Sequence, residues 1–227
     1  VEALQKDYRL LVPDLRGFGQ TSGFTGTPTL EQMAEDVEFL LLKLGITEPV
    51  VLAGLSMGGY VAFTFASKYP YRLGGLVLAD TRAEPDNAEG KANRDRMITF
   101  TETHTAREVI DQMLPRLVGP ETLAGRPEVM EEIRRLASGQ APAGIIGALR
   151  AMRDRPDATP LLGQIPVPTL VIVGNDDLLT PPNLAQDMAK TIPHARLATI
   201  PGAGHLSNLE QPDLFTEAVR SFLQSLP

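Results

Sequence analysis

Residues 50–58 read Val-Val-Leu-Ala-Gly-Leu-Ser-Met-Gly, and the order of residue types in this stretch decides how the chain folds around it. Its apolar start predicts a buried strand, and residues 60–68 have the pattern of a helix. A serine between two glycines at such a join predicts a sharp turn that presents the Ser56 hydroxyl to solvent. We expect Gly54 and Gly58 to allow this turn because neither carries a Cβ that would clash with the neighbouring chain. The alternative is an ordinary glycine-rich turn that closes a βα unit.

Composition narrows the class of protein. The chain has 227 residues, a net charge of −7 and no cysteine. A chain of this length buries about 70% of its unfolded surface, which is enough for one sizeable core. Its basic residues are scattered among acids, so we expect no nucleic-acid partner. No apolar stretch has the length of a signal region or a membrane span, and we therefore expect a cytoplasmic protein without a membrane partner.

Short apolar runs bounded by Pro, Gly or Asp are the strand candidates. Helical patterns separate the first run from the second and the second from the third, and the helix over 29–44 has a capping box from Thr29 and Gln32 and a stop at Gly45. This alternation predicts an α/β fold, with a mostly parallel sheet covered by helices on both faces. The five candidate strands are residues 8–12, 50–53, 76–79, 169–173 and 196–200.

The interval 81–160 breaks this rhythm, because it contains amphipathic helical patterns and no convincing strand. We interpret it as an all-helical insertion, or cap, in a core made of residues 1–80 and 161–227. The four helices expected in the cap cover residues 89–101, 106–117, 127–137 and 143–152.

A serine hydroxyl is a weak nucleophile until a base takes its proton, and that base needs an acid to orient it. The chain has three histidines. His205 lies in a loop between the last strand candidate and the final helix, which suits a base at the edge of the sheet. His104 and His194 have polar neighbours and are predicted to be surface residues.

Two adjacent aspartates compete for the role of the acid. Asp176 and Asp177 follow the strand candidate 169–173, and functional groups gather in such loops at the carboxyl ends of parallel strands. The alternative is that one of them caps the next helix, whose N-terminus favours a negative charge. We assign the capping or solvent-facing role to Asp176 and the catalytic role to Asp177.

Taken together, these motifs resemble the α/β-hydrolase superfamily over nearly the whole chain. Ser56, Asp177 and His205 occur in the family's chain order. The family's D-x-R-G-x-G, G-x-x-D and G-x-G-H loops look like residues 14–19, 174–177 and 202–205. In that family the acid stands three positions after the loop glycine, which supports Asp177, and the cap follows the sixth strand. The resemblance implies a Ser-His-Asp triad that needs no metal and no cofactor.

Within the superfamily, residues 79–84 and the single cap are similar to small carboxylesterases and 3-oxoadipate enol-lactonases. The expected function is therefore a serine hydrolase that cleaves small carboxylic esters or lactones through an acyl-enzyme on Ser56. The alternatives are an enol-lactonase that acts on an acidic lactone, and a hydrolase-like protein that binds a ligand with little or no turnover.

The chain departs from the family at its start. The family begins with three more strands, and a His-Gly loop after the third contributes to the oxyanion hole. In this sequence the backbone N–H of Met57 is the only hydrogen-bond donor that we expect in the oxyanion hole. Three explanations are open. The first is that the sequence is a fragment, and the second is that another copy of the chain or a separate N-terminal segment fills the gap. The third is that the strand 8–12 pairs directly with 50–53. We favour a truncated enzyme that forms a homo-oligomer or rearranges locally.

Residues of the cap are candidates for binding the substrate. Arg82 and Arg94 are candidates for binding a substrate carboxylate, although ion pairs with Glu84 and Asp95 are the alternative. Apolar cap side chains are candidates for an adaptable pocket, and ordinary packing of the cap onto the sheet is the alternative, which we favour. The pocket candidates are Met97, Phe100, Met113, Met130 and Met152.

Overall fold

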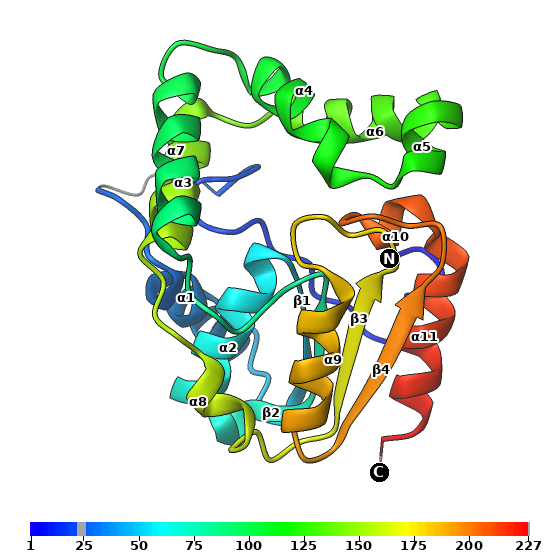
Figure 1. The fold of residues 1–227 in the computed structure, drawn as a ribbon. Coiled ribbons are helices and arrows are strands. Elements are labelled where there is room, and N and C mark those ends of the chain that lie inside the picture. The colour runs from blue at the N-terminus through cyan, green and yellow to red at the C-terminus, as the bar shows by residue number, and fades with distance from the viewer. Residues whose placement is uncertain (22–25, 227) are drawn as a thin grey trace.

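The computed structural model describes residues 1–21 and 26–226, and a parallel sheet forms its centre (Figure 1). The sheet has four strands in the order β1-β2-β3-β4, which fits the predicted α/β fold. Because all neighbouring strands run parallel, every connection must cross from one end of the sheet to the other. The strands are β1 (Val50–Leu55), β2 (Leu73–Ala79), β3 (Thr169–Gly174) and β4 (Ala195–Ile200).

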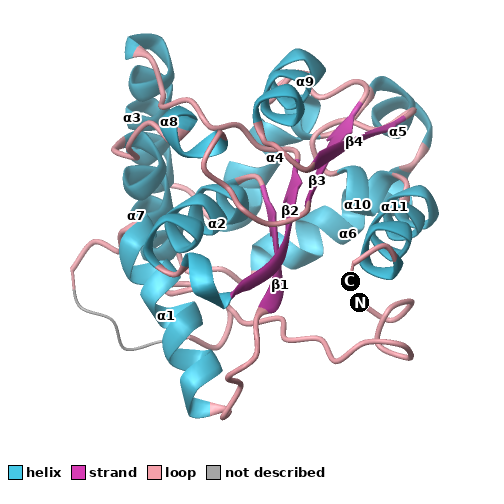
Figure 2. Cartoon of the chain, turned by 90° about the horizontal axis from the view of Figure 1, so that it is seen from below, coloured by secondary structure: helices cyan, strands magenta, loops and turns pink. Residues whose placement is uncertain are grey.

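Helices make most of these crossings and cover the sheet (Figure 2). No helix in the described part of the chain is both long and apolar enough to cross a membrane. The helices outside the interval 81–160 are α1 (Leu30–Lys43), α2 (Met57–Lys68), the 3-10 turn η1 (Pro70–Arg72), α9 (Pro182–Thr191), α10 (Ser207–Glu210) and α11 (Pro212–Gln224). Those between β2 and β3 are α3 (Ala88–Thr101), α4 (Ala106–Leu117), α5 (Pro120–Gly125), α6 (Pro127–Ser138), α7 (Pro142–Arg153) and α8 (Thr159–Leu162).

The two faces of the sheet follow from the alternation of side chains along each strand. In β2, Leu76 and Leu78 join one buried cluster, which includes residues of α2 and α9. Val77 and Ala79, one position along, join a second cluster with residues of α11 on the opposite face. Both faces of the sheet are therefore buried, which explains why β2 and β3 carry no polar side chain except that of Thr169 at the start of β3.

Local signals at α1 are confirmed. The Thr29 hydroxyl accepts a hydrogen bond from the backbone N–H of Gln32, whose side chain accepts one from the N–H of Thr29. This is the predicted capping box. Gly45 follows the helix with a φ of 67°, a conformation that glycine adopts without the steric cost of a Cβ.

The prediction of a strand over residues 8–12 is wrong, and so is its direct pairing with 50–53. These residues are irregular in the structure. Leu4 packs on the cluster beside α11, and Leu15 packs on the cluster of α1 and α2, so the segment only connects two anchor points. Leu11 and Val12 are 40% and 70% exposed. An extended run becomes a strand only beside a backbone that completes its hydrogen bonds, and no described strand lies alongside it.

The interval between β2 and β3 is helical in the structure, and the four helices expected there have ends within one residue of the predicted ones. Sequence analysis missed the short helices α5 and α8, which begin with Pro120 and with Thr159 followed by Pro160. α4 and α6 share an apolar cluster, and Leu179, Leu206 and Leu209 of the core pack against it. In Figure 1 these helices lie beyond the carboxyl ends of the strands. The division into core and cap stays a prediction.

Candidate active site

Ser56 lies on a strained turn between β1 and α2. Its φ is 52° and its ψ is −113°, a combination that residues with a side chain rarely adopt. The neighbouring strand holds this conformation, because the Ser56 N–H donates to the carbonyl of Ala79 at 2.9 Å. The Thr81 hydroxyl donates to the Ser56 carbonyl at 2.8 Å. Sheet pairing and one buried side chain thus fix the direction in which the Ser56 side chain points.

The glycines of the turn do not all have the role expected from the sequence. A Cβ on Gly54 would lie 2.2 Å from the carbonyl oxygen of Gly58, and a Cβ on Gly59 would lie 2.4 Å from the Thr81 hydroxyl. A Cβ on Gly58 would meet nothing within 4 Å. Close packing therefore requires glycine at 54 and 59, and the expectation of a clash at Gly58 is wrong. At Gly58 it is the backbone that matters, because Gly54 packs closely against it.

His205 lies between the other two residues singled out from the sequence. Its Nε2 is 2.8 Å from Oγ of Ser56, and its Nδ1 is 2.9 Å from Oδ2 of Asp177. His205 and Asp177 are 3% and 2% exposed, whereas Ser56 is half-buried. Three side chains from loops after β1, β3 and β4 thus form one continuous hydrogen-bonded chain that ends at an accessible hydroxyl.

Asp177 is anchored by its own loop as well as by His205. Its Oδ1 accepts hydrogen bonds from the N–H groups of Leu179 at 2.7 Å and Thr180 at 2.9 Å, and its Oδ2 accepts one from the Thr180 hydroxyl at 2.6 Å. Burial works to raise the pKa of Asp177. Hydrogen bonds from His205 and Thr180, and the charge of His205, outweigh burial and lower that pKa. Asp177 is therefore held as a carboxylate that faces His205, while Asp176 is half-buried.

Glu210 fixes the loop that carries His205. This carboxylate is fully buried and accepts hydrogen bonds from the N–H of Gly204 at 2.8 Å and from that of Gly119 at 2.7 Å. Gly119 precedes α5, so one side chain joins the helical interval 81–160 to the residue before His205. A Cβ on Gly204 would lie 2.5 Å from the backbone nitrogen of Gly119, so only glycine fits this approach. Sequence analysis did not single out Glu210, and no pattern around it signals a buried carboxylate.

Asp80 is a third buried carboxylate at this site, after Asp177 and Glu210. It has a φ of 44° and is fully buried. Burial raises the pKa of Asp80 to about 7, although hydrogen bonds from Ser207 and Gly174 act in the opposite direction. Asp80 stands directly after a strand, the same signal that pointed to Asp177, so sequence analysis had the means to find it.

The expected substrate-binding residues lie in different surroundings. Met57 is the first residue of α2 and packs partly against the cluster of α1 and α2. Met130 is buried in the cluster of α4 and α6, which favours the packing interpretation for this residue. Met97 is half-buried on α3, and the Phe100 ring stacks on that of His104 at 3.6 Å. His194 is exposed.

Arg82 takes part in an ion-pair network centred on the buried Asp86. The Arg82 guanidinium bonds one oxygen of Asp86, and Nε of Arg94 lies 3.0 Å from the other. Nη1 of Arg155 is 2.9 Å from Asp86, and its guanidinium carbon lies 4.2 Å from the centre of the Tyr60 ring. Burial works to raise the pKa of Asp86, but the arginines lower it. Arg82 and Arg94 thus pair with Asp86 and not with the predicted Glu84 and Asp95.

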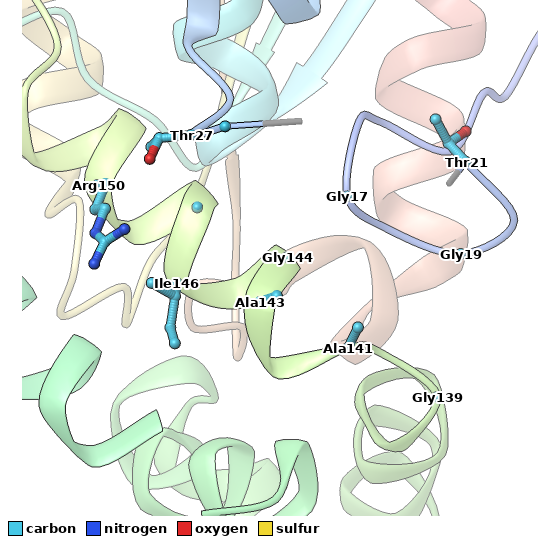
Figure 3. Close-up of a pocket in the computed structure, with 12 residues that line it drawn as sticks. Gly17, Gly19, Thr21, Thr27, Gly139, Ala141, Ala143, Gly144, Ile146 and Arg150 are labelled. Carbon is cyan, nitrogen blue, oxygen red and sulfur yellow. The ribbon is translucent and has the colours of Figure 1, made fainter. Parts of the chain in front are cut away.

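Three cavities occur in the described part of the chain, and none of them is lined by Ser56, Asp177 or His205. The largest, about 580 Å³, lies between the loop of Gly17 and Gly19 and helix α7, which contributes Ile146 and Arg150 (Figure 3). Among the described residues, no group of three or more His, Asp or Glu side chains is arranged to hold a metal ion.

The D-x-R-G-x-G loop is a structural element at that cavity. Arg16 forms two hydrogen bonds to Asp36 of α1, and the Asp14 carboxylate accepts one from the N–H of Gln20 at 2.9 Å. The N–H of Gly19 donates to Gln140, just before α7, at 2.9 Å. The loop therefore joins α1 to the helical interval, and the charged side chains of Asp14 and Arg16 both form hydrogen bonds within the chain.

Comparison with known proteins agrees with this arrangement. A sequence model described as alpha/beta hydrolase fold matches residues 1–212. The chain belongs to this family. The predicted resemblance and fold class are thereby confirmed for this hydrolase.

Its relatives include esterases and enol-lactonases. A thermophilic esterase from Thermogutta terrifontis, solved with malate bound, is 45% identical with a TM-score of 0.95, and the match covers 99% of this chain and 83% of that one. An enol-lactonase from Burkholderia xenovorans is 31% identical with a TM-score of 0.90 over 99% of this chain and 84% of that one. The curated 3-oxoadipate enol-lactonase 2 of Acinetobacter baylyi is 29% identical over 97% of this chain and 80% of its own length.

The glycine contacts generate a first prediction. We expect Gly54→Ala to lower the free energy of unfolding by about 1–3 kcal/mol or to prevent folding, because its Cβ would overlap the Gly58 carbonyl. Gly58→Ala, which points into open space inside the same motif, should change stability by less than about 0.5 kcal/mol. Urea unfolding of both variants checks this. Equal destabilisation at the two positions would contradict the packing explanation.

The buried Asp80 generates a second prediction, on pH. An unfolded aspartate titrates near pH 3.9, so the folded protein holds the Asp80 proton more tightly, with a pKa of about 7. The stability contributed by that proton is fully present below about pH 4 and is lost as the pH rises through about 7. The variant Asp80→Asn has no titrating group at this position, so its stability should not fall with pH for this reason. Melting temperatures from pH 4 to 8 should therefore fall more steeply for the parent than for Asp80→Asn, and parallel curves would refute the assignment.

Proposed function

We propose that this chain is a serine hydrolase that cleaves small carboxylic esters or lactones through an acyl-enzyme on Ser56. The observation that carries the proposal is the unbroken hydrogen-bonded chain from Ser56 through His205 to Asp177. A buried carboxylate fixes one ring nitrogen of His205 as the donor, which leaves Nε2 to accept the proton of the serine hydroxyl.

The reaction then proceeds in two steps. Oγ of Ser56 attacks the carbonyl carbon while Nε2 of His205 takes its proton, and the C–O bond to the leaving alcohol breaks as His205 returns that proton to it. Water, deprotonated by His205, next attacks the acyl carbon, and the bond from that carbon to Oγ of Ser56 breaks as His205 returns the proton to Oγ, which releases the acid. Asp177 stabilises the charged imidazolium in both steps and stays ionised, in keeping with its lowered pKa. These steps use no metal or organic cofactor.

Met57 supplies one donor for the oxyanion. It begins α2, and the first N–H groups of a helix have no partner within the helix and lie at the positive end of its dipole. An oxyanion that forms on the substrate next to Ser56 would accept a hydrogen bond from this N–H. Loss of such a donor typically costs about 10²-fold to 10³-fold in turnover.

We also propose roles for the helical interval 81–160 and for the free edge of the sheet. The helices α3 to α7 act as a cap over the site, since the N–H of Leu206, next to His205, donates to the carbonyl of Leu117 in α4.

The second role concerns the edge strand of the sheet. In the described residues β1 pairs only with β2. A strand from a second copy of the chain, or from a separate segment, would complete the hydrogen bonds of that edge.

The triad assignment is tested by matched substitutions. We expect Ser56→Ala and Asp177→Asn each to lower kcat for p-nitrophenyl acetate by at least about 10³-fold, because one removes the nucleophile and the other the carboxylate that orients His205. Asp176→Asn makes the same chemical change one residue away and should keep kcat within about 3-fold. Hydrolysis by Ser56→Ala at the parental rate would refute the assignment.

A fluorophosphonate probe separates an enzyme from a ligand-binding relative. Labelling of the parent, read as a mass increase that Ser56→Ala lacks, is expected. A well-folded parent that stays unlabelled would favour the binding alternative.

Hydrolysis of an acidic lactone is a second candidate function. It is favoured by the enol-lactonase relatives and by the excess of arginine around Asp86, where three guanidinium groups surround one carboxylate. Under this alternative, a guanidinium of Arg82 or Arg94 binds the carboxylate of the substrate.

Substrate pairs of equal size decide between the two candidates. We expect kcat/KM for a neutral lactone to match or exceed that for its carboxylate-bearing counterpart, because Asp86 already engages these arginines. A preference of about 10-fold or more for the acidic lactone, abolished by high salt, would instead establish the second candidate.

A further inference from the structure

Asp80 stands where the two loops of the triad come together. It follows the last residue of β2, between strands that lead to Ser56 on one side and to Asp177 on the other. Its backbone N–H donates to the carbonyl of Ile172 in β3 at 2.9 Å. The preceding carbonyl, of Ala79, accepts the N–H of Ser56. The backbone at this point is therefore tied both to the nucleophile turn and to the strand before the acid.

The Asp80 carboxylate joins the other two loops. Its Oδ1 accepts the N–H of Gly174 at 2.8 Å, three residues before Asp177. Its Oδ2 accepts the hydroxyl of Ser207, two residues after His205. One side chain is thus hydrogen-bonded to the end of β3, where the Asp177 loop begins, and to the start of α10, where the His205 loop ends, and both bonds are buried.

Packing alone does not account for an aspartate here. A buried carboxylate loses its hydration, and a non-glycine residue at a φ of 44° carries backbone strain. A small apolar residue would avoid the loss of hydration, and glycine would avoid both costs. What the aspartate adds is two acceptor oxygens at fixed positions, one for each loop.

We propose that Asp80 is a positioning residue for the triad, which holds the Asp177 loop and the His205 loop at the separation that their hydrogen bond requires. The proposal rests on the proposed function. Asp80 makes no bond to Ser56, His205 or Asp177 side chains, so it acts through Gly174 and Ser207. Other charged groups close to these loops are Asp177 and His205 themselves, and Glu210, which holds Gly204 on the side of the helical interval.

Two substitutions separate the carboxylate from the backbone strain. Asp80→Asn keeps both connections, because the amide oxygen accepts the Gly174 N–H and the amide nitrogen donates to the Ser207 hydroxyl. Asparagine also tolerates a positive φ. Asp80→Gly relieves the strain but removes both connections. Ser207→Ala removes only the bond to the His205 loop and serves if Asp80→Gly does not fold.

The kinetic readout distinguishes positioning from substrate binding. For p-nitrophenyl acetate, Asp80→Gly should lower kcat by about 10²-fold, as a misplacement of about 1 Å typically does, with KM little changed. Asp80→Asn should retain at least about a tenth of the parental kcat. Ser207→Ala added to Asp80→Gly should cost nothing further, because Asp80→Gly has already removed the bond that Ser207→Ala breaks. Parental kcat in Asp80→Gly, or additive losses in the double variant, would overturn the proposal.

Hydrogen exchange tests the same link without turnover. In Asp80→Gly, amides of residues 174–180 and of 203–209 should both exchange faster than in the parent, whereas Asp80→Asn should resemble the parent. Unchanged exchange in either loop would overturn the proposal even if the protein proves to be an active hydrolase. Faster exchange in both loops of a protein that no fluorophosphonate labels would uphold the link and reject the proposed function.

Discussion

The register of the parallel sheet is the constraint on which the rest of this structure depends. Leu55 of β1 pairs with Ala79 of β2, which pairs with Ile172 of β3, so the ends of neighbouring strands lie at one edge. Gly174 pairs in turn with Ile200 of β4. Ser56, Asp177 and His205 are far apart along the chain, yet each leaves the sheet within a few residues of this edge. Shifting one strand by a residue would reverse its faces and separate the three side chains.

Polar groups at this edge are buried, and the fold satisfies them in a consistent way. The carboxylates of Asp80, Asp177 and Glu210 all accept backbone N–H groups from loops. A buried polar group is tolerated only when it is hydrogen-bonded, so each of these side chains restricts the segments that can supply its donors. The geometry around His205 is thus set mainly by acceptors on neighbouring segments, and apolar packing of the sheet sets their starting positions.

How much of this arrangement can be predicted from the sequence depends on how far apart along the chain the interacting residues lie. The turn at Ser56, the capping box of α1 and the loop that carries Asp177 depend on residues close together in the chain, so their positions are predictable from the sequence. The strand expected over residues 8–12 depends on a partner backbone, which periodicity cannot supply. The roles of Gly59 and Glu210 depend on Thr81, Gly119 and Gly204, whose proximity exists only after folding. Asp80 is predictable only in part: the sequence shows that it follows a strand, but it does not show that Ser207 is its hydrogen-bond partner.

The bridge from Glu210 to Gly119 and Gly204 has a consequence for protein engineers who exchange caps between hydrolases. A transplanted cap that replaced the backbone donor at 119 would leave one oxygen of a fully buried carboxylate without a partner, directly beside the histidine loop. The graft would then disturb the core even if its own helices folded correctly. Junctions chosen outside residues 117–119 keep this donor with the host, so the remaining helices can be exchanged while His205 keeps its place.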